Sequence, residues 1–268
     1  MTMKVSGNGF LTKDGRNKTT VIKNRHIKAF RSYEKIIKKC RSVVLSVEMN
    51  EQATEKDRQK IIAIVLAVRL LEICEAALVI LRHGLSNEAD TLFRVFLDAY
   101  FIFVNVCLCP KFIVEYFRSD EPARLKLMNA AARHNSELFE DLNKYVTPEI
   151  KGQLKQKISE ECIKAFKSEE YAKTAGCSII YDSLYRLMSA PLHTTPRSLA
   201  KYVEEDENGN IIKIKYYPVE EDLPQRVYDF AYFLIKVIGG LKDVFEVSNE
   251  NEIKAMIDEL NRSVKLET

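Results

Sequence analysis

Glycine and proline are scarce in this chain, with nine Gly and seven Pro among 268 residues. Both residue types interrupt regular secondary structure, so their scarcity favours long, uninterrupted helices. Hydrophobic residues make up 46 % of the sequence, which is enough for a sizeable core and too much for a disordered chain. A chain of this length can form one large domain or two small ones.

The motifs that hold common cofactors are missing as well. The sequence contains no GxxxxGK(S/T) loop for a nucleotide phosphate and no GxGxxG after a strand for a dinucleotide. It also lacks the HExxH pattern of zinc proteases and the GxSxG pattern of serine hydrolases. The four histidines are scattered and none belongs to a Glu-x-x-His pair, so we expect neither a metal site nor a bound cofactor.

The six cysteines show no metal-binding spacing, because no CxxC pair occurs. Several of them stand inside apolar stretches, as buried free thiols do. The first residues of the chain are polar and contain no apolar run, so we expect no signal peptide. These observations predict a reducing, cytoplasmic location.

The most apolar stretch, residues 95–109, does not have the pattern of a membrane span. It contains Asp98 and Asn105, is followed by Pro110, and is shorter than the roughly 20 residues that a span needs. We therefore expect a buried core helix and no membrane segment.

Positive charge is concentrated at the start of the chain. Residues 1–41 contain twelve Lys and Arg and two acids, a net charge of +10, so the remaining residues carry −7 of the overall +3. A basic first element on an acidic body could attract a polyanion such as RNA. The other interpretation is a solvated helix face that pairs with the acidic remainder. The basic side chains that we consider for nucleic-acid binding are Lys23, Arg25, Lys28, Arg31 and Lys35.

Apolar residues at steps of three and four predict helices along most of the chain. Residues 1–20 are polar and contain three glycines, so we expect a flexible N-terminal tail before a single helical domain at residues 21–268. Thr54 and Gly84 mark the start and the end of one of the helices. The expected helices span residues 21–48, 55–82, 86–109, 111–145 with a break near Pro122, 148–171, 179–189, 220–246 and 250–264.

Residues 200–218 interrupt the helical pattern. Asn208-Gly209 is a strong short signal for a β-hairpin, and the residues after it alternate between apolar and charged. We therefore predict an all-α fold, an up-and-down helical bundle with a small β-hairpin insertion at about residues 200–218.

Charged residues interrupt the apolar helix at residues 86–109. Arg94 and Asp98 stand four residues apart on one helix face, and Glu88 lies within two turns of them. Apolar neighbours place these charges at the border of the core, where a charge is costly unless it is paired. They form either a buried ionic clasp between two helices or a polar pocket that orients a ligand or a catalytic group.

Arg186 and His193 stand at the end of a predicted helix and are separated by six residues. This spacing resembles the HEPN superfamily motif, in which an arginine is followed by four to six residues and a histidine. The chain has Leu187 where that superfamily usually has a polar residue. The resemblance implies a small helical bundle, and in many members the motif cleaves RNA without a metal. Two protomers usually face each other to complete the site.

The two residue types suit that chemistry. A guanidinium stays charged and can hold a phosphate in a bidentate grip. An imidazole with an unperturbed pKa of about 6.5 can accept and return a proton near neutral pH. Together they could drive the attack of a ribose 2′-hydroxyl on its own phosphate, leaving a 2′,3′-cyclic phosphate. The alternative is that His193 caps or pairs locally and that Arg186 lies on a solvated face.

Two further blocks of the sequence form a recognisable pattern. The first contains Gly84, Asn87, Glu88, Ala89, Leu92, Arg94 and Asp98, and the second contains Tyr185, Ser189, His193, Ser198 and Leu199. These blocks resemble a further helical family, the domain of unknown function 5677. The likeness covers roughly residues 55–247. It implies that Arg94, Asp98, Ser189 and His193 belong to one polar site, and it brings no settled activity with it.

Two functions therefore stand open. The first is a metal-independent endoribonuclease, a toxin or phage-defence effector acting as a homodimer, in which Arg186 binds phosphate and His193 transfers protons. The residues that would support this site are Ser189, Tyr185, Arg94, Asp98 and Glu88, and the basic helix would raise the affinity for RNA. The second is a non-catalytic helical module that binds a protein partner or nucleic acid, with the hairpin as a docking edge.

Overall fold

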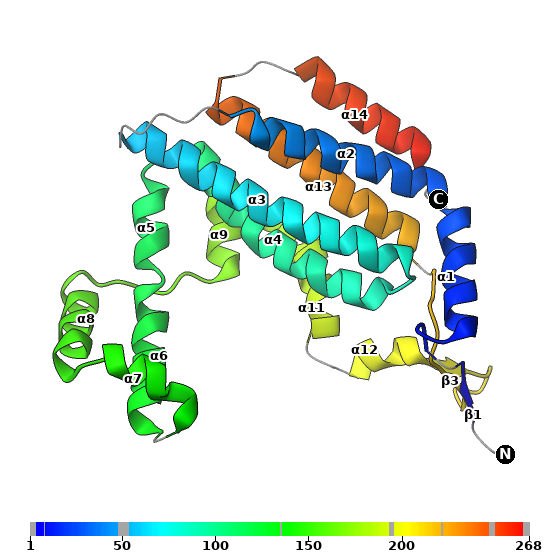
Figure 1. Cartoon of the computed structure of the whole chain (residues 1–268), viewed down its shortest axis with the longest axis horizontal. Helices are drawn as coiled ribbons and strands as arrows, with labels where there is room; N and C mark the ends of the chain where they lie inside the picture. Colours follow the sequence, from blue (N-terminus) through cyan, green and yellow to red (C-terminus); the bar gives the residue numbers. More distant parts are fainter. Residues whose placement is uncertain are drawn as a thin grey trace.

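The computed structural model describes residues 4–7, 9–47, 54–134, 136–192, 196–220, 222–246 and 250–264. The protein is mostly helical and carries a small sheet, which confirms the predicted helical class and the antiparallel hairpin. Figure 1 shows the long helices side by side, with shorter helices extending from one end of this group and the sheet at the other end.

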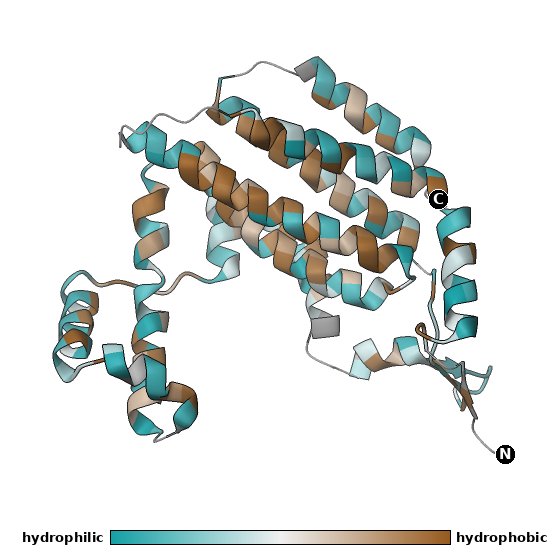
Figure 2. Ribbon diagram, viewed as in Figure 1, coloured by the Kyte–Doolittle hydropathy of each residue, from teal (hydrophilic) through white to brown (hydrophobic). Residues whose placement is uncertain are grey.

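Four long helices build the core: α2 (Ile27–Leu45), α3 (Glu55–Arg82), α4 (Ser86–Leu108) and α13 (Leu223–Val244). Each contacts at least two of the others, and α14 (Glu250–Ser263) covers α2 and α13. Hydrophobic residues gather on these long helices, whereas α14 is more hydrophilic (Figure 2). The core therefore lies between the long helices.

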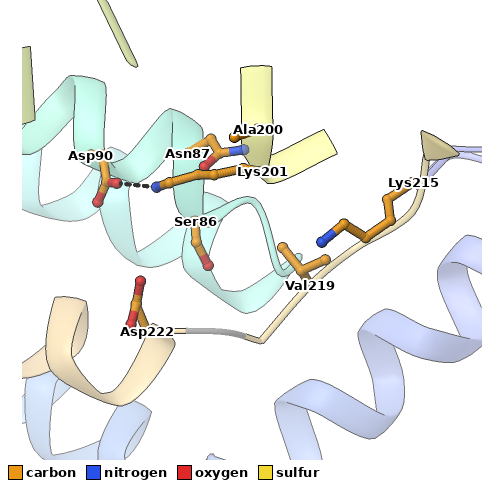
Figure 3. A pocket seen from close by; sticks show the side chains of 8 residues that line it. All are labelled: Ser86, Asn87, Asp90, Ala200, Lys201, Lys215, Val219 and Asp222. Carbon is orange, nitrogen blue, oxygen red and sulfur yellow. Dashed lines mark hydrogen bonds and ion pairs between the residues drawn. The ribbon is translucent and has the colours of Figure 1, made fainter. Parts of the chain in front are cut away.

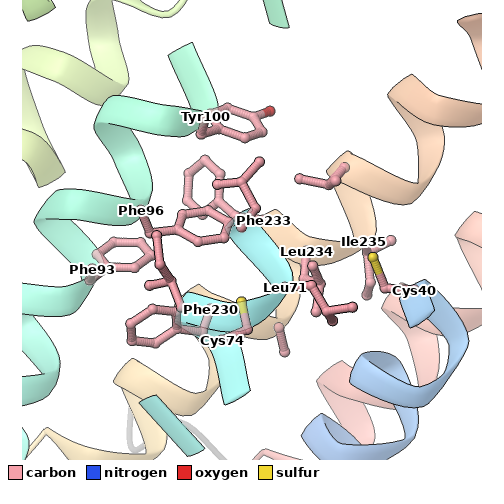
Figure 4. Packing of buried hydrophobic residues seen from close by; sticks show 14 of the residues in the cluster. Cys40, Leu71, Cys74, Phe93, Phe96, Tyr100, Phe230, Phe233, Leu234 and Ile235 are labelled. Carbon is pink, nitrogen blue, oxygen red and sulfur yellow. The ribbon is translucent and has the colours of Figure 1, made fainter. Parts of the chain in front are cut away.

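Aromatic side chains from α4 and α13 interlock at the centre of this core (Figure 4). The Phe93 and Phe230 rings meet edge to face with centroids 4.9 Å apart, and Tyr100 meets Phe233 in the same way at 5.1 Å. Edge-to-face pairs add stabilisation beyond the apolar area that they bury. This packing fixes α4, the helix that carries the predicted polar residues, against α13.

Helix α3 has the ends that its sequence predicts. The Thr54 side chain accepts a hydrogen bond from the Asp57 backbone, and the Asp57 side chain accepts one from the Thr54 backbone, which is a capping box. At the other end Gly84 adopts a φ of +70°, the left-handed region that favours glycine. The chain turns there directly into α4, so α3 and α4 are antiparallel neighbours.

Helix α4 is, among the described residues, the one helix that is long and apolar enough by length and composition to cross a membrane. The core helix of a soluble protein passes the same test, so this property alone is weak support for a membrane span. In the structure α4 packs against α3, α13, α9 (Ser168–Thr174) and α11 (Arg186–Leu192). Helix α4 thus contacts several other helices of the protein.

The first residues of the chain form regular secondary structure, whereas we predicted a flexible tail there. Residues Lys13–Arg25 form helix α1, whose first turn is capped by the Thr12 hydroxyl, and His26 separates α1 from α2. Strand β1 (Lys4–Ser6) pairs in parallel with β3 (Ile211–Lys215). The partner strand is about 200 residues away in the sequence, so local composition could not reveal this pairing.

The predicted hairpin forms from β2 (Val203–Glu205) and β3, which are antiparallel with Val203 opposite Ile214. Together with β1 they make a sheet of order β1-β3-β2. The 3-10 turn η3 (Ala200–Tyr202) leads into β2, and the short helix α12 (Pro196–Leu199) precedes it.

Two of the predicted helices are divided more often than we expected. The segment at residues 111–145 contains α5 (Phe112–Arg118), α6 (Glu121–Arg133), the 3-10 turn η1 (Glu137–Phe139) and α7 (Glu140–Tyr145). The segment at residues 148–171 contains α8 (Pro148–Glu160) and the first part of α9. Pro122 stands in the first turn of α6, a position where the missing N–H of proline costs little.

Candidate functional site

The predicted polar site forms where α11 packs against α4. Five side chains meet there, which we call the Arg94 cluster: Arg94, Asp98, Ser168, Tyr185 and Ser189. Arg94 and Asp98 lie one turn apart on α4 and form an ion pair. Arg94 Nε donates a hydrogen bond to Ser189 Oγ at 3.1 Å, and Tyr185 Oη donates one to Asp98 Oδ1 at 2.9 Å. The cluster therefore fastens α11 to α4.

Tyr185 is the centre of this cluster. The Arg94 guanidinium carbon lies 3.6 Å from the centroid of the Tyr185 ring, and the Tyr181 ring stacks on Tyr185 at 4.6 Å. Burial raises the pKa of Tyr185 to about 12, and the neighbouring Asp98 carboxylate acts in the same direction. The phenol is thus held in its neutral form, in which it can donate to Asp98.

The backbone around Tyr185 departs from regular α-helix. Helix α10 (Ser178–Ile180) continues into a π-helical turn at Tyr181–Tyr185, labelled η2, and α11 begins directly after it at Arg186. Such wide turns are rare and occur frequently at functional sites. Here the turn brings Tyr185 and Ser189 to face α4, while Arg186 faces outwards.

Arg186 lies outside the Arg94 cluster. Its side chain is 59 % exposed, and Nε donates to Asp182 Oδ1 at 3.0 Å across one turn. Its guanidinium carbon is 5.2 Å from the Tyr181 ring centroid. The second residue of the proposed pair, His193, lies outside the described residues. Of the four residues that the family resemblance groups in one site, the structure brings Arg94, Asp98 and Ser189 together.

Glu88 does not belong to the cluster, contrary to our expectation. It is exposed near the start of α4 and makes no hydrogen bond or ion pair with another residue of the described part of the chain. Arg94 stands six positions further along the helix, a rotation equivalent to about 240°, which places the two side chains on different faces. Sequence distance within two turns was therefore a poor guide to the helix face.

Ser168 is a member of the cluster that sequence reasoning missed. It is the first residue of α9, and its hydroxyl donates to Asp98 Oδ1 at 2.5 Å. Ser168 is 70 residues from Asp98 in the sequence, and nothing in its own surroundings marks it. It could be found only from the packing of α9 against α4.

A second buried charge network, also missed, lies one turn before Arg94 on α4. Asp90 forms an ion pair with Arg226 of α13 and accepts a hydrogen bond from Lys201 at 3.0 Å. Arg226 also contacts Asp229 at 3.3 Å. Burial acts to lower the pKa of Arg226, but nearby carboxylates, including those of Asp90 and Asp229, outweigh it and raise that pKa. Burial raises the pKa of Asp229. The charged pair Arg226 and Asp229 inside the apolar sequence of α13 was the available signal.

The basic side chains that we considered for RNA binding are all exposed on α1 and α2. Two of them pair with acids elsewhere: Arg25 with Glu220, and Lys35 with Glu259 at 2.7 Å. Helix α2 packs against α3, α13 and α14, whereas α11 packs against α4. The structure therefore does not bring this basic surface together with the Arg94 cluster.

Comparison with known proteins identifies the family of the chain. No curated protein and no solved structure matches the chain. The model of the family of unknown function DUF5677 matches residues 60–211, a segment that contains the whole Arg94 cluster and Arg186. Since this segment is more than half of the chain, the protein belongs to the family DUF5677.

Proposed function

We propose that the protein is a metal-independent endoribonuclease of the HEPN type. The observation that carries the proposal is the placement of Arg186, which faces solvent directly beside a polar cluster that holds its helix in place. The ion pair between Arg186 and Asp182 is exposed on both sides, and such pairs contribute only about 0–1 kcal/mol. A phosphate could therefore take the place of Asp182 at little cost.

In the proposed reaction, Arg186 binds the scissile phosphate and His193 moves the proton. The ribose 2′-oxygen forms a bond to phosphorus, and the bond from phosphorus to the 5′-oxygen breaks. The imidazole accepts the proton of the 2′-hydroxyl and returns a proton to the 5′-oxygen as that oxygen leaves. The products are a 2′,3′-cyclic phosphate and a 5′-hydroxyl. Arg94, Asp98, Tyr185 and Ser189 position α11 and do not touch the RNA.

The proposal includes a homodimer. Ile179 and Leu187 flank Arg186 along the same helical segment, and they are 84 % and 56 % exposed. Large apolar side chains on one exposed segment are suited to a protein contact. A second copy packed there would bring two Arg186 side chains into one cleft. Such an enzyme would act in the cytoplasm as a toxin or phage-defence effector.

We also propose that the long helices form an up-and-down bundle, because α3 and α4 are antiparallel and the remaining long helices lie alongside them (Figure 1). The sheet would then be an insertion at one end of a single helical domain. This arrangement leaves α11 free to present Arg186 on the side of α4.

A second function is favoured by a different observation. The charged groups of the Arg94 cluster find their partners within the protein, as in a clasp that only holds two helices together. Two of the basic side chains of α1 and α2 are likewise paired with acids. A non-catalytic module that binds a protein or nucleic acid would need no more than this.

An RNA-cleavage assay in excess chelator tests the proposal. Wild-type protein is compared with Arg186→Ala and His193→Ala, and the ends of the products are identified by mass spectrometry. Arg69→Ala is a matched control, since Arg69 is 58 % exposed and pairs with Glu72 on its own helix, and His83→Ala serves as the histidine control. Cyclic phosphate ends that disappear in both site variants and persist in both controls support the nuclease. Equal cleavage by all five proteins points to contamination and contradicts it.

A further inference from the structure

A pocket of about 290 Å³ lies at the start of α4 (Figure 3), and Arg186 is not among the residues that line it. It is bounded by the first turn of α4, by η3, and by the segment that leads from β3 to α13. Its lining residues are Ser86, Asn87, Asp90, Ala200, Lys201, Lys215, Val219 and Asp222. Most of these residues are polar or charged, and no part of the proposed nuclease mechanism uses this concave site.

Gly84 does not line the pocket, but it holds one of the lining residues, Val219, close to the start of α4. The Val219 backbone N–H donates to the Gly84 carbonyl at 3.0 Å, which ties the segment after β3 to the start of α4. A Cβ at Gly84 would come within 2.7 Å of Ile22 Cδ1 and 3.0 Å of the Val219 carbonyl oxygen, and its φ of +70° also disfavours a side chain. The segment that carries Val219 thus lies against the start of α4, and Ser86 and Lys215 line the same pocket.

Ser86 provides an unused hydroxyl at this place. The residue is only 5 % exposed, and its Oγ has no hydrogen-bond partner in the described part of the chain. A buried hydroxyl without a partner is costly, so it is expected to have one in the functional protein. Figure 3 shows the hydroxyl directed into the pocket, between Lys215 and Asp222.

The first turn of α4 adds further donors. Its N-cap is Leu85, which provides no side-chain hydrogen bond, so the first backbone N–H groups of the helix remain without a side-chain cap. The partial positive charge at a helix N-terminus favours anions. Together with the Ser86 hydroxyl, these groups form a set of hydrogen-bond donors suited to an oxyanion.

Two lysines supply positive charge. Lys215 reaches into the pocket and makes no ion pair with any residue that the structure describes (Figure 3). Lys201 lies on the opposite side and is anchored by Asp90, whose charge is already matched by Arg226. The remaining carboxylate, Asp222, lines the pocket from the α13 side. An anion would thus sit at the Ser86 and Lys215 side.

We propose that this pocket binds the phosphate group of a small phosphorylated ligand. The phosphate oxygens would accept hydrogen bonds from the Ser86 hydroxyl, from the first N–H groups of α4 and from the Lys215 ammonium. The ester side of the ligand would extend towards Asp222, which can accept a hydrogen bond from a hydroxyl. The proposal is independent of nuclease activity, because it involves neither Arg186 nor His193.

Calorimetric titration at low ionic strength tests this site, with inorganic phosphate, adenosine monophosphate, a 5′-phosphorylated deoxyoligonucleotide and adenosine as the probes. Lys215→Gln and Ser86→Ala should each raise the dissociation constant for the phosphate probes by about tenfold. Lys213→Gln is the matched control, since Lys213 stands on the same strand but pairs with Glu204 at 3.2 Å and does not line the pocket. The control should bind like the wild type.

The probes also separate the possible sources of the phosphate. Tighter binding of the monophosphate than of inorganic phosphate identifies a small ester, tighter binding of the oligonucleotide identifies a nucleic-acid end, and equal binding identifies the phosphate itself. A second readout keeps the test independent of folding: Ser86→Ala should melt at the same temperature as the wild type or higher while it loses phosphate binding, because the buried hydroxyl has no partner without ligand. Absence of binding by every phosphate probe, binding of adenosine as tight as that of its monophosphate, or equal weakening in Lys213→Gln would overturn the proposal.

Discussion

The guanidinium carbon of Arg94 lies 3.6 Å from the centroid of the Tyr185 ring, and this contact joins α4 to the π-helical turn that leads into α11. Asp98 binds both residues, through an ion pair with Arg94 and a hydrogen bond from the Tyr185 hydroxyl. Arg94, Asp98 and Tyr185 thus provide one another with charged and hydrogen-bonding partners at this helix contact.

Removal of the Arg94 guanidinium should destabilise the protein. Arg94→Ala loses the contact with the ring and leaves Asp98 without its cation, and we expect a loss of about 2–4 kcal/mol in the free energy of unfolding. Arg94→Lys keeps the charge but not the planar fork, and should fall between wild type and Arg94→Ala. Urea denaturation measures these differences. A loss for Arg94→Ala no larger than that for the exposed Arg69→Ala would contradict the structural role.

The buried pair of Asp90 and Arg226 predicts a strongly non-additive double-mutant cycle. Arg226→Met leaves Asp90 in the core with Lys201 as its remaining cation, and should cost about 3 kcal/mol or more. Asp90→Leu combined with Arg226→Met removes both charges and should cost less than the sum of the single changes. Denaturant unfolding of the four proteins gives the coupling energy. Additive effects would show that the two side chains do not form a pair in solution.

Tyr185 predicts a loss of stability at high pH. Its pKa is raised to about 12, above the value of 10.0 for an unperturbed tyrosine, so the folded state keeps a proton that the unfolded state releases. The stability from this shift is fully present below about pH 10 and is lost as the pH rises through about 12. Between about pH 10 and about pH 12, the free energy of unfolding of Tyr185→Phe should therefore fall less than that of the wild type. Denaturant unfolding at several pH values measures this difference. Tyr145→Phe, at an exposed tyrosine, should lose as much stability as the wild type over this pH range. An equal loss of stability in Tyr185→Phe and the wild type would contradict the raised pKa of Tyr185.

The thiols should divide into two classes by reactivity. All six cysteines lie in the described part of the chain and are free, with Cys109 and Cys162 exposed. Burial raises the pKa of Cys40 and of Cys107 to about 12, so neither is a thiolate near neutral pH. A thiol reagent added to native protein should label Cys109 and Cys162 rapidly and the other four cysteines only upon unfolding. Rapid labelling of Cys40 or Cys74 would contradict the packing of α2 and α3.

The long helices could be predicted because their apolar residues repeat at the helical period and their ends carry local signals. Thr54 caps α3 and Gly84 ends it, as the sequence indicated. The pairing of β1 with β3 and the contact of Ser168 with Asp98 could not be predicted, because each depends on residues far apart in the chain. Glu88 was misplaced because a range of two turns does not specify a helix face. The pair Arg94 and Asp98 was found because both stand on one face of a single helix.

We propose that Arg186 and His193 cleave RNA without a metal. The initial rate of RNA cleavage in excess chelator tests this most directly. We predict that His193→Ala lowers this rate by about a hundredfold or more, as expected for the loss of a proton-transfer group. Arg186→Ala should also lose activity, while the matched variant Arg69→Ala keeps the wild-type rate. Unchanged rates in His193→Ala and Arg186→Ala, or no cleavage by the wild-type protein, would contradict the proposed nuclease.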